Sequence, residues 1–422
     1  CEETAWQLPA HNSYIRDTPQ LILPDVTRPV MDLFACETGA LLACAAYLLE
    51  DDLNAVSPYI LTCIEDNLKH RILLPYLTAH FWWMGHDDEP MCNWTVWCTQ
   101  NVLLTTFLMP WSVEMSSRLS SPVRTFCGNA PLFLPENTSD TVVTLQAILH
   151  KAAESCDYFL KDYGNDGCCG EGAQYYRHAG LCLYGAMTVL NTVTDGHFDT
   201  LFRWDKVKNI ASYILNVHVN DKYYFNFADC SPIAGRAGVR EYLFGKATGQ
   251  EDLCLFAAKD FQAGQGQLVT DEVNGGNLFY RMQTVFHYEE LMQQNTSGIL
   301  SHRDVYYPSV GLFLVHSDTL DLAVKAGDNA DSHNHNDTGS ITLYKNGLPI
   351  LADIGVETYT RKTFSPRRYE IWTMQSGYHN LPTICGTDQK DGVEYRAENV
   401  MTVLTGAEPS ISMELAAAYP AA

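Results

Sequence analysis

The chain changes from helical to β-rich patterns of apolar and polar residues at about residue 298. Up to that point, apolar segments of helical length alternate with loops that carry Gly, Pro, Asn and Asp. These segments predict helices over 31–49, 58–77, 94–108, 141–160, 178–193, 204–217 and 252–262. Many helices paired along the sequence are typical of an α/α toroid or solenoid.

Beyond this point the apolar segments are short, rich in residues that favour strands, and separated by turns. They predict strands over 305–308, 311–315, 320–325 and 340–344. A run of helices followed by a run of strands indicates an α+β chain with segregated domains. We place the boundary after residue 298.

Side chains able to bind a metal alternate in the segment 331–340. His333, His335 and Asp337 are each two residues apart, and in a strand such side chains share one face. The β-rich sequence that follows favours a strand through these residues. A strand would point all three side chains the same way, which suggests a site more than a generic surface.

A β-hairpin is predicted directly after this segment, because Asn346-Gly347 separates two short apolar runs. The hairpin folds Asp353 back toward His335, and His379 follows later in β-like sequence. A lone histidine at that position is usually structural. Together with the hairpin it completes a set of two imidazoles and one carboxylate, which suits Zn²⁺.

Composition limits the classes of partner. The apolar fraction of 46% and charged fraction of 18% are those of a folded globular protein. With 27 basic and 50 acidic residues, the formal charge of −23 argues against nucleic acid or an anionic membrane surface as a partner. No apolar run is long enough for a transmembrane helix.

The fourteen cysteines are scattered, several of them within apolar helical patterns, and they form no Cys-x-x-Cys pair. This usage favours a reduced, cytoplasmic compartment. The chain starts at Cys1 without Met, so we expect both ends to be cut from a longer chain. A secreted or periplasmic protein whose signal peptide has been removed is the alternative.

A glycine-rich loop over 164–172 ends at Glu171 and runs into a helix that carries Tyr175, Arg177 and His178. One interpretation is a tight interhelical turn with surface aromatic residues, since most loops are only connections. The other is an acid or base at the mouth of a helical cavity. A tyrosine near Arg or a protonated histidine can have its pKa lowered enough to act as a base.

Two further positions are ambiguous. Asn93 stands before a helix and is read either as its N-cap or as a polar site residue. The tryptophans around it belong to the core or stack on sugar rings: Trp82, Trp83, Trp94 and Trp97. Asp229 lies in a predicted loop, as a cap, a hydrogen-bond anchor or a weak candidate for the substrate side.

Together these residues resemble the heparinase II/III-like polysaccharide lyases, which include oligoalginate and heparinoid lyases. The motifs that match are Asn93-Trp94, Glu171-Gly172-x-x-Tyr175, His-x-His-x-Asp-x-Gly-Ser over 333–340, Ala352-Asp353-x-Gly355 and His379-Asn380. The resemblance covers most of the chain, and the His-x-His block is its specific part. It implies an N-terminal α/α toroid over residues 1–298 and a C-terminal antiparallel β-sandwich over 299–422.

The resemblance also implies an activity: cleavage of the glycosidic bond beside a uronic acid by β-elimination, on an anionic polysaccharide or oligosaccharide. It implies Tyr175 as base and also as acid, Asn93 as the amide that neutralises the uronate, and His333 as the catalytic histidine. It implies three ligands for a mainly structural zinc: His335, Asp353 and His379. We expect the substrate side to hold Glu171, Arg177, His178, Trp94 and Arg368.

Asp337 then supports its neighbours and is not a ligand. The adjacent Arg367 and Arg368 are expected to supply a local positive field for an anionic glycan in an acidic protein.

Two other functions stay open at this point. An α/α-toroid glycoside hydrolase needs two carboxylates that flank the bond, and Glu171 with Asp229 is the pair available. A non-catalytic glycan-binding protein with a structural zinc is the other. The sequence leaves homo-oligomerisation open.

Overall fold

The computed structural model describes most of the chain, and its contacts divide the chain into two compact units. The described residues are 5–11, 23–119, 144–268, 277–406 and 408–420. The first unit consists of Cys1–Asp162, Cys182–Asp199 and Gly276–Met282, and the second of Tyr163–Leu181, Thr200–Gly275 and Gln283–Ala422. The domain boundary after residue 298 stays a prediction.

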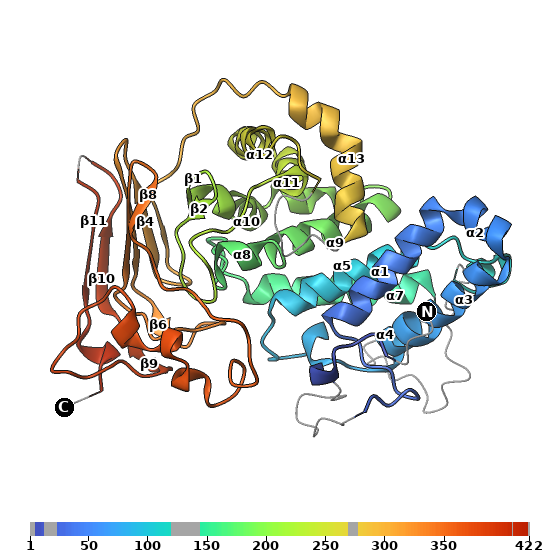
Figure 1. Cartoon of the computed structure of the whole chain (residues 1–422), viewed down its shortest axis with the longest axis horizontal. Helices are drawn as coiled ribbons and strands as arrows, with labels where there is room; N and C mark the ends of the chain where they lie inside the picture. The colour runs from blue at the N-terminus through green and yellow to red at the C-terminus, as the bar shows by residue number, and fades with distance from the viewer. Residues whose placement is uncertain (1–4, 12–22, 120–143, 269–276, 407, 421–422) are drawn as a thin grey trace. The chain divides into compact units, whose positions relative to one another are not determined.

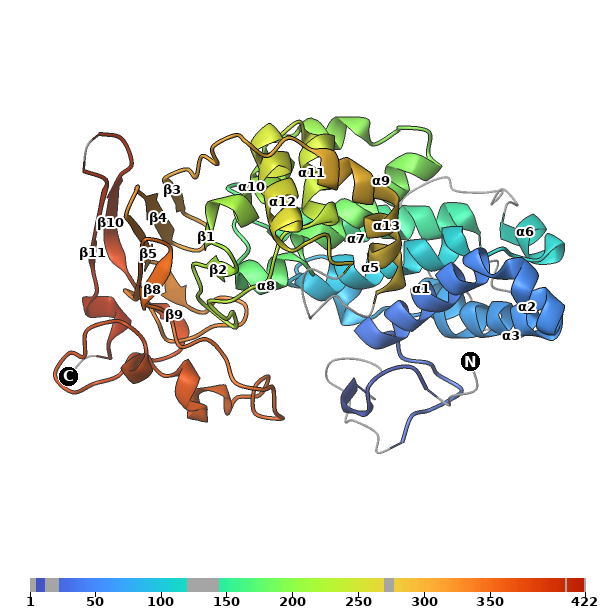
Figure 2. The same cartoon turned by 45° about the horizontal axis from the view of Figure 1, so that its top comes forward.

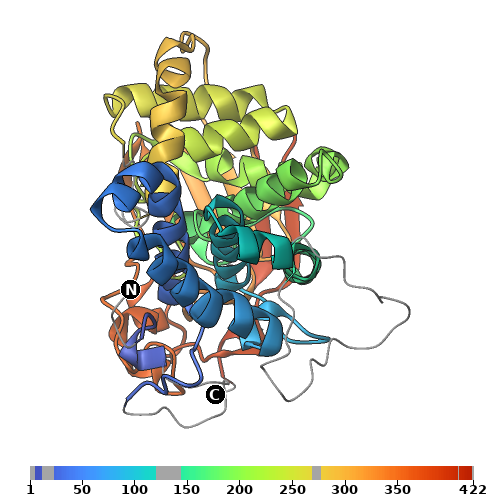
Figure 3. The same cartoon turned by 90° about the vertical axis from the view of Figure 1, so that its right-hand side faces the viewer.

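The first unit is helical, and Figure 3 shows most of its helices in blue and teal. It comprises α1 (Leu33–Leu48), α2 (Glu50–Val56), α3 (Tyr59–Leu68), η2 (Lys69–Leu73), α4 (Leu74–Thr78), α5 (Asn93–Leu108), α6 (Val113–Leu119), α7 (Leu145–Asp162) and most of α9 (Gly180–Val193). The Asp32 side chain caps α1 by accepting from the Ala35 N–H at 2.8 Å. A Cβ on Gly39 would lie 2.9 Å from Thr105 Oγ1, so this glycine lets α1 approach α5 closely.

Two predicted helices of this unit are broken. The segment 31–49 is divided into α1 and α2 at Leu49. The segment 58–77 is divided into α3, the π-helical turn η2 and α4. Pro75 has no N–H to donate to the preceding turn, which explains why the regular helix is interrupted there. The first residues of the helix predicted over 141–160 lie outside the described residues, and α7 begins at Leu145.

No single helix among the described residues is long and apolar enough to cross a membrane. Helices α1 and α2, bent by 85° at their junction, pass that test only as a pair and only by length and composition.

The second unit contains helices and all the strands that the structure describes. Its helices are α8 (Gly172–Tyr176), α10 (Asp205–Asn216), α11 (Val239–Thr248), α12 (Glu251–Ala263) and the greater part of α13 (Leu278–Gln293). Helices α10, α11 and α12 pack against one another (Figure 2). The predicted helices over 204–217 and 252–262 are confirmed as α10 and α12, whereas α11 and α13 were not predicted.

Every strand pair in this unit is antiparallel (Figure 1). The strands are β1 (His218–Asn220), β2 (Tyr223–Tyr224), β3 (Val305–Tyr307), β4 (Leu312–His316), β5 (Leu320–Lys325), β6 (Asp328–Asn329), β7 (Ile341–Lys345), β8 (Leu348–Leu351), β9 (Gly392–Arg396), β10 (Glu398–Val403) and β11 (Ser410–Glu414). The main sheet has the order β3-β4-β5-β7-β8, and β1-β2, β6-β9 and β10-β11 are separate pairs. The predicted α+β class is confirmed as a mixture of helices and antiparallel sheets.

The predicted hairpin is β7 and β8. Its tip residues Asn346 and Gly347 have φ angles of 51° and 73°, as a type I′ turn requires. Lys345 pairs with Leu348 across the turn. Because the turn fixes the register, the chain leaves β8 directly toward Asp353.

Candidate functional site

The predicted strand through 333–337 is wrong, because β6 ends at Asn329 and the residues that follow form turns. Within them the Asp337 N–H donates to the His335 carbonyl at 3.0 Å, and the Ser340 N–H to the Asp337 carbonyl at 2.8 Å. His333 has a φ of 57°, a left-handed conformation that non-glycine residues rarely adopt. Strained backbone of this kind is often found at functional sites.

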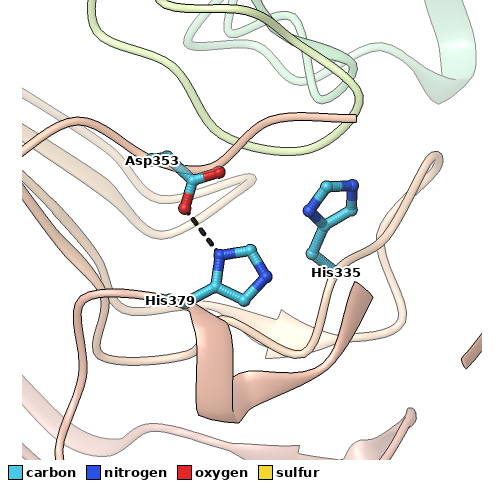
Figure 4. Close-up of side chains that lie close together, drawn as sticks. All are labelled: His335, Asp353 and His379. Atoms are coloured by element: carbon cyan, nitrogen blue, oxygen red, sulfur yellow. Dashed lines mark hydrogen bonds and ion pairs between the residues drawn. The ribbon is translucent and has the colours of Figure 1, made fainter. Parts of the chain in front are cut away.

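His335, Asp353 and His379 lie together in the second unit (Figure 4). One potential ligand atom from each lies within 4.8 Å of the others, and all three residues are buried. His335 comes from the turn-rich segment, Asp353 from the chain after β8, and His379 from the residue after the 3-10 turn η8 (Ser376–Tyr378). Three segments distant in sequence therefore converge on one point, as the predicted ligand set requires.

The donor atoms of this cluster fit a metal ion. His379 Nδ1 lies 2.6 Å from Asp353 Oδ2. Across the described residues, His335 Nδ1 and His379 Nε2 are buried and no hydrogen bond reaches either atom. A buried polar atom without a partner is costly, and a metal would satisfy such nitrogens.

Charge in the cluster is balanced between the carboxylate and the imidazoles. Burial alone would raise the pKa of Asp353, but the hydrogen bond and charge of His379 hold it below its usual value. Burial alone would lower the pKa of His379, and the hydrogen bond and charge of Asp353 raise it instead.

Asp337, the third alternating side chain, contacts Lys325 and is not part of the His/Asp/His cluster. Its Oδ1 lies 2.9 Å from Lys325 Nζ, and Asp331 Oδ2 lies 2.9 Å from the same amine. Lys325 is 4% exposed, and its pKa is raised by these two carboxylates against the effect of burial. The expectation that Asp337 supports its neighbours without being a ligand agrees with this geometry.

A second cluster adjoins the candidate metal site and centres on Asp229. This side chain is 1% exposed. Its Oδ1 lies 2.9 Å from His335 Nε2 and 2.7 Å from Arg368 Nη2. Its Oδ2 lies 2.7 Å from His333 Nδ1 and 3.0 Å from the Tyr359 hydroxyl. Burial alone would raise the pKa of Asp229, but the hydrogen bonds from the two histidines and the charge of Arg368 hold it far below the usual value.

Tyr175 meets this cluster at Tyr359, where the two hydroxyl oxygens are 2.6 Å apart. The Tyr175 ring also contacts His333, with ring centroids 4.6 Å apart. Since an ionised carboxylate only accepts, Tyr359 donates its single proton to Asp229. Tyr175 must then donate to Tyr359. The hydroxyl protons therefore run in one direction, from Tyr175 to Tyr359 to Asp229.

This environment keeps Tyr175 protonated. Burial raises the pKa of Tyr175 to about 12, and the charges of Asp229 and Glu171 add to the rise, although the hydrogen bond with Tyr359 opposes it. The expected lowering of the pKa of this tyrosine is therefore not observed. For His333, burial would lower the pKa, but Glu171 and Asp229 raise it above the usual value, which favours the imidazolium.

Glu171 faces the same histidine. Its Oε2 lies 3.9 Å from His333 Nε2, and its Oε1 accepts from the Ser332 hydroxyl at 3.4 Å. The side chain is 6% exposed. As a hydrolase pair, Glu171 and Asp229 are poorly suited, because all four acceptor positions of Asp229 are occupied by protein donors.

The basic residues predicted for the substrate side, Arg367 and Arg368, form hydrogen bonds and ion pairs within the protein. Arg368 is 8% exposed and donates to Asp229, to the Asn334 carbonyl and to the Thr363 carbonyl. Arg367 pairs with Glu370 through two bonds of 2.8 and 2.7 Å. The positive field expected from this arginine pair is thus largely matched by nearby carboxylates.

Arg177 and His178 are also interior residues of the second unit. Arg177 is 2% exposed and its Nε lies 3.3 Å from Glu241 Oε1, while His178 is 1% exposed. His178 contacts the Tyr175 ring, with centroids 5.9 Å apart. Their predicted contact with substrate stays a prediction.

Asn93 and Trp94 belong to the first unit. The N-cap interpretation of Asn93 is wrong, because the N-cap of α5 is Cys92 and Asn93 is the first helical residue. Asn93 is 3% exposed. Trp94 packs on Trp82 and His11, with ring centroids 5.1 and 5.0 Å away, which agrees with a packing role for this side chain.

The sequence understated two residues of the cluster. Asp229 was a weak candidate and Tyr359 was assigned no specific role, yet both lie at the centre of the cluster. The loop of Asp229 is tied to the metal segment, because the Asn226 amide donates to the Asp353 carbonyl at 3.2 Å and accepts from the Asp353 N–H at 3.3 Å. Nothing local in the sequence reports this pairing, since it joins residues far apart in the chain.

Comparison with known proteins bears on the second unit in particular. Residues 301–403 match the family described as "Heparinase II/III-like, C-terminal". The structure titled "Heparinase III-BT4657 gene product" is similar to 90% of this chain at 14% identity, with a TM-score of 0.51. A second structure, titled "Heparinase III-BT4657 gene product, Methylated Lysines", is similar to 87% of this chain at 15% identity, with a TM-score of 0.45.

This chain covers 50% and 48% of those two chains, so it spans about half their length. At such identities the likeness shows the fold alone. No curated protein matches the sequence. The predicted resemblance is confirmed by the family match, which falls inside the predicted C-terminal domain.

Proposed function

The chain carries the C-terminal region of the heparinase II/III-like family, and on this premise we propose that it is a polysaccharide or oligosaccharide lyase. Its substrate is an anionic glycan that contains uronic acid, either glycosaminoglycan-like or alginate-like. Its reaction is β-elimination at the bond beside the uronate. The observation that carries the proposal is the array of Tyr175, Tyr359 and His333 around the buried carboxylate of Asp229.

β-Elimination makes three demands on a site. The weakly acidic C5 proton must be taken by a base, the leaving oxygen must receive a proton, and the charge that develops on the uronate must be stabilised. A hydroxyl, an imidazolium and an amide meet these demands without any carboxylate nucleophile. The array around Asp229 supplies the first two of these groups.

Tyr175 is suited to the acid step as it stands, because its pKa of about 12 keeps it protonated. For the base step it acts as the small phenolate fraction. At pH 8 that form costs about 5.5 kcal/mol, from about 1.4 kcal/mol per pH unit, and is a strong base once formed. Tyr359 lies against the same oxygen: it accepts from the Tyr175 phenol, and it would hold the phenolate by turning its own proton from Asp229 to Tyr175.

His333 supplies positive charge beside Tyr175. Its raised pKa favours the imidazolium, whose Nδ1–H is committed to Asp229. Its Nε2 faces Glu171 at 3.9 Å, on the side of the ring away from Asp229. We assign charge stabilisation to His333, and we retain Asn93 as the amide that neutralises the uronate, on the family resemblance.

The metal ligands would be His335, Asp353 and His379, and zinc is the ion that two imidazoles and one carboxylate suit. When bound, zinc would supply a divalent positive charge and a cross-link between the three segments. The carboxylate of Asp353 would balance part of the metal's charge. The His335 side chain is hydrogen-bonded to Asp229 and so connects this cluster to the second one. We also propose that the helices complete an α/α toroid and the strands a β-sandwich.

The first test of this function is optical. A lyase leaves a C4–C5 double bond that absorbs in the ultraviolet, whereas a hydrolase product does not absorb. The protein should release such product from at least one member of a panel of heparinoids, chondroitins, hyaluronan, alginate and ulvan-type glycans. Reducing ends without absorbance would identify the hydrolase, and neither signal would leave only a binding protein.

The Tyr175→Phe variant tests the mechanism on whichever glycan is cleaved. It keeps the ring packing on His333 and removes only the hydroxyl, so we expect turnover to fall by about 100-fold or more. The matched control is Tyr158→Phe in the first unit. Turnover that survives in Tyr175→Phe at the wild-type rate would overturn the assignment.

A further inference from the structure

We propose that Asp229 is the positioning residue that sets the protonated nitrogen of both His333 and His335. One carboxylate would then order the metal ligand and the catalytic histidine together. The inference deepens the proposed function and rests on it for the part that concerns His333. The part that concerns His335 stands on the metal site alone.

The argument begins with the acceptor capacity of the carboxylate. An ionised carboxylate offers about four lone-pair positions and no proton. In Asp229 all four positions are occupied. Two nitrogens, from His335 and Arg368, contact Oδ1, and a nitrogen of His333 and the Tyr359 hydroxyl contact Oδ2. Each of the four partners must therefore be a donor. A side chain that is 1% exposed has no water with which to exchange them.

For His335 this requirement selects one ligand atom. The Nε2 must carry a proton, because it faces Asp229 Oδ1 at 2.9 Å. The lone pair is then on Nδ1, which is the buried atom that no hydrogen bond reaches within the described part of the chain. We therefore assign Nδ1 as the metal-binding atom of His335. A carboxylate behind a ligating imidazole fixes its orientation and strengthens it as a ligand.

For His333 the same requirement fixes the orientation of the imidazole ring. The Nδ1–H points to Asp229 Oδ2, so Nε2 is turned away from it and toward Glu171. The same Oδ2 accepts from Tyr359, which lies 3.2 Å from His333 Nδ1. Asp229 thus holds both neighbours of Tyr175 in one geometry while contacting no solvent itself.

The Asp229→Asn variant removes this control with little change of shape. An amide NH₂ cannot accept, so at least two of the four donors lose their partner. We expect zinc affinity to fall by about 10–100-fold. We also expect kcat to fall by about 100-fold or more through misplacement of the reacting groups, with a much smaller change in KM.

Asp260→Asn is the matched control. Asp260 is 6% exposed and accepts from Arg236 and from the Ala237 N–H, each at 2.6 Å, so it is also a buried aspartate beside an arginine. It is expected to keep zinc affinity and kcat. Thermal unfolding of both variants reports the general cost of losing a buried carboxylate.

The wild-type protein provides a readout that needs no variant to fold. A crystal structure with zinc bound should show coordination through Nδ1 of His335, and coordination through Nε2 would overturn the inference. If the wild type cleaves a glycan and binds zinc but Asp229→Asn matches Asp260→Asn in both, the inference fails. If the wild type produces no unsaturated sugar, the proposed function fails while the zinc measurements still decide the role of Asp229.

Discussion

The protonation state of Tyr175 predicts how the reaction depends on pH. The pKa of this tyrosine is raised to about 12 by burial and by the charges of Asp229 and Glu171, so the phenolate fraction is small at neutral pH and grows about tenfold per pH unit. If the phenolate is the base, kcat should rise with pH at about that slope from pH 7 upward. Initial rates of ultraviolet absorbance between pH 7 and 9.5 measure the slope.

The Tyr359→Phe variant sharpens this test. It removes the hydroxyl that lies against the Tyr175 oxygen, and a bond from Tyr359 to the Tyr175 phenolate is the contribution that lowers the pKa of Tyr175. The slope should remain while the rate falls at every pH. A rate that is flat and then declines with rising pH would show that Tyr175 acts only as the acid.

At the residue scale, the sequence identified the candidate metal ligands better than it identified the residues that support them. His335, Asp353 and His379 occur in motifs, and the structure brings them within 4.8 Å. Asp229 could not be ranked, because its importance comes from contacts more than a hundred positions away in the chain. Tyr359 has the same difficulty, since its partner Tyr175 is 184 positions distant.

At the scale of elements, stacked histidines predict acid sensitivity. His218 on β1 and His316 on β4 enclose His302, which precedes β3, with ring centroids of 5.7 Å (His218–His302) and 4.7 Å (His302–His316). Burial lowers the pKa of His218 to about 3 and that of His302 to about 4. In the unfolded chain each titrates at about 6.5.

Between about pH 4 and 6.5 these histidines are therefore protonated in the unfolded state but not in the folded state. Stability rises with pH across this window, is complete above 6.5, and is lost as the pH falls. At pH 5 each histidine removes about 2 kcal/mol from the free energy of unfolding, at about 1.4 kcal/mol per pH unit. Urea unfolding at pH 7 and pH 5 measures the difference.

His302→Gln should remove about half of that pH dependence, because one of the two buried rings no longer titrates. His197→Gln, at an exposed position, is the control. An equal pH dependence in the wild type and His302→Gln would rule out this histidine as the cause.

The elements also show what local patterns can and cannot predict. The β7–β8 hairpin is predictable because Asn346 and Gly347 adopt the positive φ angles that their turn needs. The segment 331–340 reads as a strand because its side chains alternate, but it forms turns. His333 has a positive φ there, and Lys325 draws Asp337 away from the metal cluster. Long-range contacts of this kind override alternation, and they are invisible to a local pattern.

At the scale of the whole molecule, metal removal should affect one of the two compact units. His335, Asp353 and His379 all belong to the second unit, so zinc that binds only the folded form stabilises that unit by mass action. Zinc at about 1,000 times its Kd would add about 4 kcal/mol to the free energy of unfolding. In calorimetry, a chelator should lower the transition temperature of this unit and leave that of the helical unit unchanged.

The choice of metal and a ligand variant are the controls for this prediction. Zinc, but not magnesium, should restore the transition temperature, since imidazole ligands disfavour the harder ion. The His335→Ala variant should unfold at the lower temperature with or without zinc. A chelator that shifts neither transition, with zinc absent from the purified protein, would mean that the buried His/Asp/His cluster is held by hydrogen bonds alone.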